Sequence, residues 1–161
     1  MAAINQIDPI KKNDLNIRAE NLIKDTKILN IARLAKMLVD LYGQVEPFKK
    51  IGKLEGKEIE LYLKELDGYI TFILTSDKNN FTCHAEKAID PVARIIINVK
   101  EEKILNVISN IIRSKSNIFG LAKLLKYIIP GKAKIKGSYV AAIKLIRCLM
   151  IGKHEMYKKS K

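Results

Sequence analysis

The residue types that commonly catalyse reactions are few in this sequence and poorly spaced for chemistry. The 161 residues include two histidines, His84 and His154, and two cysteines, Cys83 and Cys148. A nucleophile beside a base would be the simplest use of Cys83 and His84. These two residues lie in an alternating stretch, however, which sends adjacent side chains to opposite faces of a strand. We therefore expect no such pair, and we expect both cysteines to be buried free thiols.

Other signatures of enzymes do not occur in the sequence. There is no GxSxG, no glycine-rich phosphate loop and no HExxH pattern. From Lys103 to the last residue the only acid is Glu155, so a catalytic carboxylate pair is not available in that region. We predict a non-enzymatic protein with no catalytic residue, no metal ligands and no cofactor.

Positive charge is concentrated in the second half of the chain. Residues 1–80 carry 13 Lys and Arg against 12 Asp and Glu, whereas residues 81–161 carry 17 against 5. This asymmetry indicates an anionic partner. Aromatic residues make up only 6% of the chain and Trp is absent, which leaves little material for stacking nucleic-acid bases. The composition therefore disfavours nucleic acid, although a basic nucleic-acid-binding module remains the main alternative function.

Apolar periodicity predicts an α+β fold. A helical stripe extends from near Asp14 to Gly43, and a break near Asp25–Thr26 would divide it into two helices. Alternation predicts four strands, the first two joined by the hairpin dipeptide Asp67-Gly68, at residues 58–65, 69–75, 81–85 and 94–99. Helices are predicted at residues 101–113, 118–129 and 138–151. A short basic strand at residues 132–136 precedes the last of these helices.

The basic strand lies within residues 130–139, PGKAKIKGSY. Its lysines alternate with Ala133 and Ile135, so we expect the apolar side chains to face inward and the lysines outward. The helices on either side are apolar over more of their surface than one packed face requires. This excess indicates a ligand pocket, an oligomer interface or an exposed patch.

Residues 58–145 resemble the sterol carrier protein 2 domain, the SCP2-like lipid-transfer family. The landmarks occur in order: the meander EIELYLKELDGYITFILTSDKNNFTCHAE, the strand ARIIINV with the helix EEKILNVI, and PGKAKIKGSYVAAIKL. The resemblance implies a five-stranded, mostly antiparallel sheet covered on one face by helices. It also implies an apolar tunnel for fatty acyl chains, acyl-CoA or sterols. Arg94 stands where family members often carry Asp, and the peroxisomal C-terminal tripeptide is absent, which points to a prokaryotic relative.

On this basis we expect an N-terminal helical segment, residues 1–57, packed on an SCP2-like lipid-binding domain, residues 58–161. Residues 70, 72, 74, 95, 97, 99, 133 and 135 should face inward from the sheet. The predicted ligand-binding residues are Ile70, Phe72, Leu74, Ile95, Ile97, Ile108, Ile112, Phe119, Leu124, Leu125, Ile128, Ile143, Ile146 and Met150. The residues predicted to contact headgroups or a membrane are Lys123, Lys126, Lys132, Lys134, Lys136, Lys144 and Arg147.

The predicted function is intracellular lipid binding or transfer in the cytoplasm. The expected partners are a lipid or acyl-CoA-like ligand and, peripherally, an anionic membrane. A second possibility is an accessory subunit that presents a lipid intermediate to a biosynthetic enzyme. No signal peptide is recognised at residues 1–14, and no apolar run approaches the ~20 residues that span a bilayer. The sequence leaves the oligomeric state open.

Overall fold

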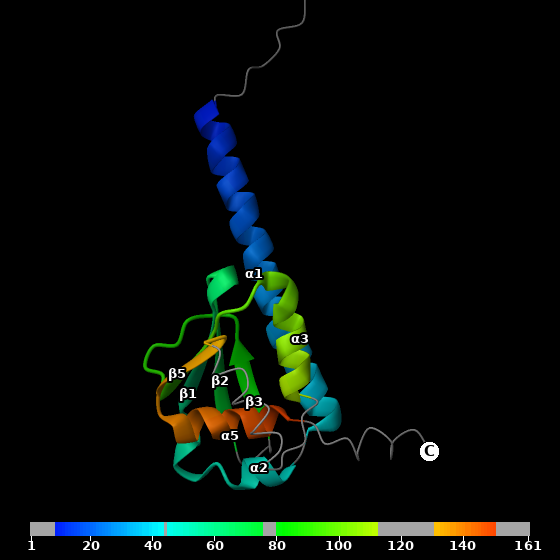
Figure 1. Ribbon diagram of the computed structural model, residues 1–161, viewed down its shortest axis with the longest axis vertical. Helices are drawn as coiled ribbons and strands as arrows, with labels where there is room; N and C mark the ends of the chain where they lie inside the picture. Colours follow the sequence, from blue (N-terminus) through cyan, green and yellow to red (C-terminus); the bar gives the residue numbers. More distant parts are fainter. Residues whose placement is uncertain (1–8, 44, 76–79, 113–130, 151–161) are drawn as a thin grey trace, which may run out of the picture.

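The structure is a computed structural model that describes residues 9–43, 45–75, 80–112 and 131–150. Five strands form one mixed sheet in the order β3-β2-β1-β4-β5 (Figure 1). The strands are β1 (Glu58–Leu63), β2 (Gly68–Thr75), β3 (Asn80–His84), β4 (Ala93–Ile97) and β5 (Ala133–Gly137). The predicted fold class is confirmed, and the strand boundaries lie close to those that alternation predicted.

The sheet is antiparallel except at its centre. The β1–β2, β2–β3 and β4–β5 pairs are antiparallel, whereas β1 and β4 are parallel. The Asp67-Gly68 hairpin is confirmed, with Asp67 in the left-handed region at φ 44°. A short 3-10 turn, Lys64–Leu66, precedes it, and a second one, Gly52–Leu54, precedes β1. The parallel pair arises because the chain crosses from the β3 edge to β4 on the other side of β1.

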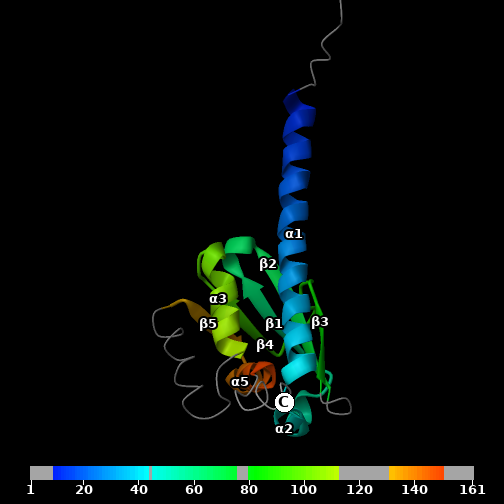
Figure 2. The ribbon, with the colours of Figure 1, turned by 90° about the vertical axis from the view of Figure 1, so that its right-hand side faces the viewer.

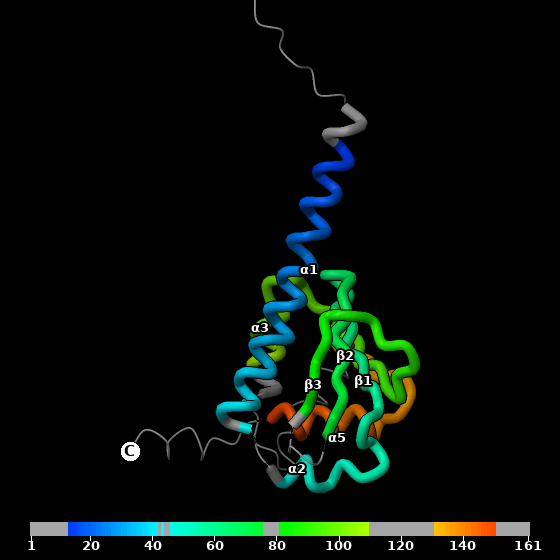
Figure 3. Tube along the Cα trace, turned by 180° about the vertical axis from the view of Figure 1, so that it is seen from behind, coloured from blue at the N-terminus to red at the C-terminus, as the bar shows by residue number. Residues whose placement is uncertain are grey.

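The helices lie on one face of the sheet. They are α1 (Pro9–Tyr42), α2 (Val45–Lys49), α3 (Glu101–Ile112) and α5 (Tyr139–Leu149). Figure 3, seen from behind, shows the strands in front of α5 and to one side of α1 and α3. The Ser138 hydroxyl accepts a hydrogen bond from the Ala141 N–H at 3.2 Å and caps the N-terminus of α5. The predicted helix 118–129 lies outside the described residues.

The helix α1 is continuous over 34 residues, so the break considered at Asp25–Thr26 is absent. It packs on the sheet only from Ile28 onwards, where Ile28, Ile31, Ala35 and Val39 are buried. Residues 13–27 are exposed, and Figures 1 and 2 show this part of α1 extending beyond the other elements. The second half of α1 thus packs on the sheet.

One glycine permits the close approach of α1 to the sheet. A Cβ atom at Gly68, the first residue of β2, would lie 1.9 Å from Ile28 Cδ1. A side chain there would require the Ile28 side chain or the helix to move, because such a distance is far inside van der Waals contact. Gly68 therefore leaves room for the Ile28 side chain against the start of β2.

Candidate functional site

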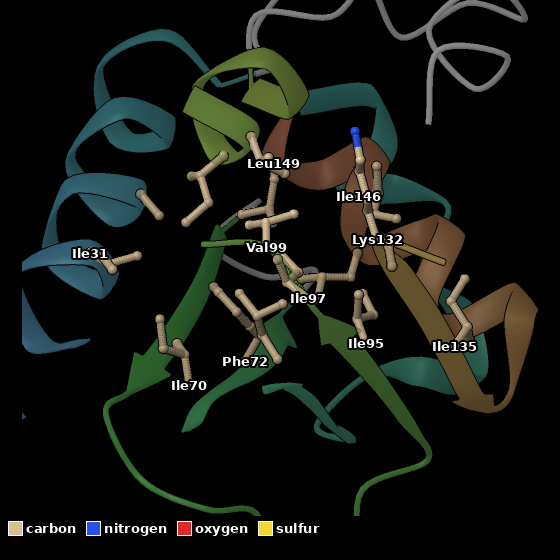
Figure 4. A pocket seen from close by; sticks show the side chains of 16 residues that line it. Ile31, Ile70, Phe72, Ile95, Ile97, Val99, Lys132, Ile135, Ile146 and Leu149 are labelled. Carbon is tan, nitrogen blue, oxygen red and sulfur yellow. The ribbon is translucent and has the colours of Figure 1, made fainter. Parts of the chain in front are cut away.

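An apolar pocket lies between the sheet and the helices (Figure 4). Every strand except β3 contributes to its wall, together with α1, α3 and α5. The residues that line it are Ile31, Ala35, Leu61, Ile70, Phe72, Ile95, Ile97, Val99, Val107, Ile108, Lys132, Ala133, Ile135, Leu145, Ile146 and Leu149. Lys132 is the only charged or polar side chain among them.

Strand alternation and register build the floor of the pocket. Leu61 of β1 is paired with Ile70 of β2 on one side and with Ile95 of β4 on the other. Ile95 is paired in turn with Ile135 of β5. Paired residues direct their side chains to the same face of a sheet. One row of four aliphatic side chains therefore crosses four strands and faces the helices.

The pocket has a volume of about 70 Å³. Pockets that enclose a drug-sized ligand usually measure roughly 300–1,000 Å³. The space between these side chains therefore accommodates a short piece of hydrocarbon chain and not a whole lipid. The helix α3 covers it while packing mainly against α5, and an exposed ion pair between Lys27 and Glu101 joins α3 to α1.

Lys132 corrects an expectation from the sequence. It was expected to point away from the pocket with Lys134 and Lys136, yet it lines the pocket. Lys132 lies in a bend before β5 begins at Ala133, so strand alternation does not govern its direction. Its backbone oxygen accepts a hydrogen bond from the Asn98 N–H at 2.8 Å. Figure 4 shows its amino group at the edge of the pocket, above the apolar side chains.

The predicted ligand-binding residues divide into three groups. Those that line the pocket are Ile70, Phe72, Ile95, Ile97, Ile108 and Ile146. Three others do not line it, since Leu74 and Met150 are buried elsewhere in the core and Ile143 is half-buried. The Phe119, Leu124, Leu125 and Ile128 positions lie outside the described residues, as does the side chain of Ile112.

The predicted headgroup residues also differ in their surroundings. Lys134, Lys136 and Arg147 are exposed. Lys144 is half-buried, and its Nζ donates to the backbone oxygen of Ile51 at 3.1 Å. Lys144 therefore ties α5 to the segment before β1 and is not directed freely to solvent. Lys123 and Lys126 lie outside the described residues.

The α1 side of the pocket was not predicted from the sequence. Ile31 and Ala35 lie one turn apart and both are buried. Their place in the helical stripe was recognised, but periodicity gives a face and not the partner that this face contacts. The same reason explains why four other lining residues were missed. Each is an apolar residue on a face that the sequence predicts to be packed in the core: Leu61, Val107, Leu145 and Leu149.

Comparison with solved structures agrees with this architecture. The chain superposes on a structure described as "UbiJ-SCP2 Ubiquinone synthesis protein" with a TM-score of 0.54 and 14% sequence identity. The match covers 79% of this chain and 96% of that one. The fold is SCP2-like. Neither a protein-family model nor a curated protein matches the sequence.

A second solved structure is more distantly similar. It is the stereoselective inverting sec-alkylsulfatase Pisa1 from Pseudomonas sp., with a TM-score of 0.43 and 9% identity. The match covers 68% of this chain but only 14% of that protein. A likeness of this size carries no argument about the present chain.

The outer face of the SCP2-like sheet holds a structural charge cluster. The Glu60 side chain is fully buried and pairs with Arg94 through Oε1, and its Oε2 accepts from the Ala88 N–H at 3.0 Å. Glu58 accepts from the N–H groups of Ile89 and Asp90 at 3.0 and 3.1 Å. These carboxylates hold residues 85–92, the crossing from β3 to β4, against the sheet. Arg94 is thus the partner of a buried acid.

The thiols and the described histidine do not form a catalytic site. Burial raises the pKa of Cys83, whose Sγ contacts the Ala32 oxygen at 3.5 Å under α1, while His84 is exposed. Burial raises the pKa of Cys148 to about 12. Both thiols therefore stay protonated near neutral pH, and a thiol is a weak nucleophile. His154 lies outside the described residues.

The same part of the chain offers neither a metal site nor a membrane span. Among residues 9–43, 45–75, 80–112 and 131–150, no group of three His, Cys, Asp or Glu side chains could hold a metal ion. Within these ranges every helix is too short or too polar to cross a bilayer.

Proposed function

We propose that this chain is a non-enzymatic lipid-binding protein that holds the hydrocarbon part of a fatty-acyl, isoprenoid or sterol-like ligand in the pocket. The observation that carries the proposal is the apolar wall, in which Lys132 is the one charged side chain among the described residues. Each buried methylene contributes about 0.8 kcal/mol, so such a wall binds a chain without polar contacts. The similarity in fold to the UbiJ-SCP2 ubiquinone synthesis protein supports this assignment.

Ligand entry requires the pocket to enlarge, because its volume is about 70 Å³. The helix α3 is the wall best suited to move outward, since it packs mainly on α5. Its first turn is also joined to α1 by the ion pair of Glu101 with Lys27, both of which are exposed. An exposed ion pair contributes at most about 1 kcal/mol, which a few buried methylenes of ligand would outweigh.

The test combines native mass spectrometry of the purified protein with displacement of a fluorescent fatty acid. We expect a copurified apolar ligand, or displacement with a dissociation constant below about 100 µM. Val107→Phe fills the pocket from α3 and should abolish binding. Leu105→Phe is the matched control, because Leu105 is 54% exposed on the same helix. If no apolar ligand copurifies and none binds, the proposal is wrong.

The position of Lys132 indicates an anionic head on the ligand. Its aliphatic stem borders the apolar wall and its amino group lies at the edge of the pocket. A carboxylate or phosphate would meet the ammonium there while the chain extends inward. Lys132→Met should weaken the binding of dodecanoic acid or dodecyl phosphate about five-fold, which is the upper range for an exposed ion pair. The binding of 1-dodecanol should stay unchanged. Lys134→Met is the control. Equal weakening of the alcohol would exclude this role for Lys132.

The basic surface on β5 would serve membrane contact. Lys134 and Lys136 are exposed, as is Arg147 on α5. Each basic residue near an anionic bilayer contributes about 1 kcal/mol. We expect flotation with phosphatidylserine vesicles that is lost in high salt and reduced in Lys134→Gln/Lys136→Gln. Flotation that is insensitive to salt or to these changes would contradict this role.

Presentation of a lipid intermediate to an enzyme is the second candidate. The observation that favours it is the name of the matched structure, which describes a ubiquinone synthesis protein. A pull-down from the native cell that recovers a lipid-modifying enzyme in stoichiometric amount would support presentation. Lipid transfer between vesicles by the purified chain alone would favour free transport.

A further inference from the structure

Exposed apolar side chains are concentrated on α1. Among the described residues, eight of the twelve exposed large hydrophobic side chains belong to this helix. Leu15, Leu22 and Leu29 recur every seven residues and Met37 follows eight later, with exposed fractions of 59%, 68%, 37% and 49%. Such spacing places them along one side of a helix. This outer stripe lies opposite the buried stripe that contains Ile31 and Ala35.

The outer stripe has two different halves. Its first half lies on residues 13–27, which extend beyond the other described elements (Figure 2). Its second half borders an open groove of about 480 Å³, lined by Leu29, Arg33 and Met37 of α1 and by Cys83 of β3. One face of one helix therefore offers both an extended apolar arm and a groove beside the domain.

The charges on the arm fit another helix better than a polyanion. Residues 13–27 contain three acids and three bases, in contrast to the strongly basic second half of the chain. Asp14 and Arg18, like Glu20 and Lys24, have the i, i+4 spacing of helix-surface ion pairs. Mixed charges of this kind are typical of helices that pack on helices. A charge-balanced arm gains nothing from an anionic membrane or nucleic acid.

One polar group on the stripe, Thr26, is compatible with burial. Thr26 lies between Leu22 and Leu29, and its Oγ1 donates to the Leu22 oxygen at 2.8 Å. Its hydroxyl is therefore satisfied within the helix, so covering it leaves no unpaired donor.

We propose that α1 pairs antiparallel with α1 of a second copy, so that the arm of each covers the groove side of the other. A two-fold axis near Thr26 brings Leu15 of one copy opposite Met37 of the other, since each is eleven residues from Thr26. It likewise brings Ile23 opposite Leu29, and the overlap from 15 to 37 spans about 33 Å. A two-fold contact buries both surfaces at once, and the antiparallel direction places the two sheets at opposite ends of the paired helices, because each sheet packs on α1 only from Ile28 onwards.

The first test is the mass of the full chain by size exclusion with light scattering. We expect a dimer, and we expect Leu22→Lys to raise its dissociation constant at least ten-fold, roughly the effect of one buried leucine per copy. Ile17→Lys is the matched control: Ile17 is 49% exposed but lies on the other side of the arm. Both positions are exposed in a single copy, so circular dichroism should show that neither variant unfolds.

The second test reports orientation. In a Cys83→Ala background, chains carrying Leu15→Cys are mixed with chains carrying Met37→Cys and oxidised. A 15–37 disulfide between copies supports the antiparallel arrangement, and a 15–15 disulfide overturns it. A monomer at all concentrations also overturns the proposal, as does a dimer indifferent to Leu22→Lys. Hydrogen exchange that shows a protected arm in a monomer would assign the face to another segment of the same chain, and so excludes the second copy.

Discussion

Filling the pocket should stabilise the protein. Ala35 lines the cavity from α1 and is 4% exposed. A cavity of about 70 Å³, at about 24 cal/mol per Å³, lowers stability by up to about 1.7 kcal/mol. Ala35→Leu keeps the helix propensity nearly unchanged and directs a larger side chain into this space. We expect the free energy of unfolding in urea to stay the same or to rise by as much as that amount.

The control is an alanine that is packed on all sides. Ala142 on α5 is 0% exposed and does not border this cavity. Ala142→Leu should therefore destabilise by about 1–3 kcal/mol, as overpacking does. Fatty-acid displacement on the same samples should show that Ala35→Leu binds poorly despite its stability. If Ala35→Leu loses as much stability as Ala142→Leu, the interior is filled and the argument for a ligand fails.

Three further predictions concern stability. Arg94→Met should lower the free energy of unfolding in urea by about 3 kcal/mol, because it leaves the buried Glu60 carboxylate without its cation. Adding Glu60→Gln should recover part of this lost stability, and a double variant with no recovery would contradict the explanation. The pKa of the Cys148 thiol is raised from 9.0 to about 12, so the unfolded state loses its proton first as pH rises. The free energy of unfolding should then fall by about 1 kcal/mol between pH 9 and 10, and a Cys148→Ala variant with the same slope would refute this. Gly131→Ala should destabilise by about 1 kcal/mol, because Gly131 has a positive φ. Gly137→Ala should destabilise by more, because Gly137 also has a positive φ and a Cβ there would lie 2.7 Å from the backbone oxygen of Val92. Thermal melts with the reverse order would be inconsistent with this prediction.

The strands and their inward faces could be predicted because their signals are local. Alternation in EIELYLKE and YITFILT, with Asp67-Gly68 between them, fixes two strands and their hairpin without tertiary information. The same alternation identified Ile70, Phe72, Ile95 and Ile97, which line the pocket. The position of β4 beside β1 could not be predicted in this way. It depends on a crossing held by Glu58 and Glu60, whose bonds to the backbone of residues 88–90 have no periodic signature.

The helical side of the pocket was harder to predict. A stripe shows that one face is buried, but Ile143 and Ile146 of α5 carry the same signal although only Ile146 borders the cavity. Lys132 was misplaced because a single bend before β5 uncouples it from the alternation of Lys134 and Lys136. The volume of a cavity depends on how the side chains of several elements pack against one another. Neither the presence of the cavity nor its size therefore follows from the residue pattern of one segment.

The long α1 helix has a thermodynamic consequence. Its inner half supplies Ile31 and Ala35 to the cavity wall and presses Ile28 against Gly68, and its outer half is free of the sheet. A continuous helix transmits a tilt from one end to the other, so a partner bound to the outer half of α1 would also displace the part of α1 that lines the cavity. Ligand binding in the cavity and partner binding at the arm would then change each other's affinity, and the coupling free energy would be the same in both directions.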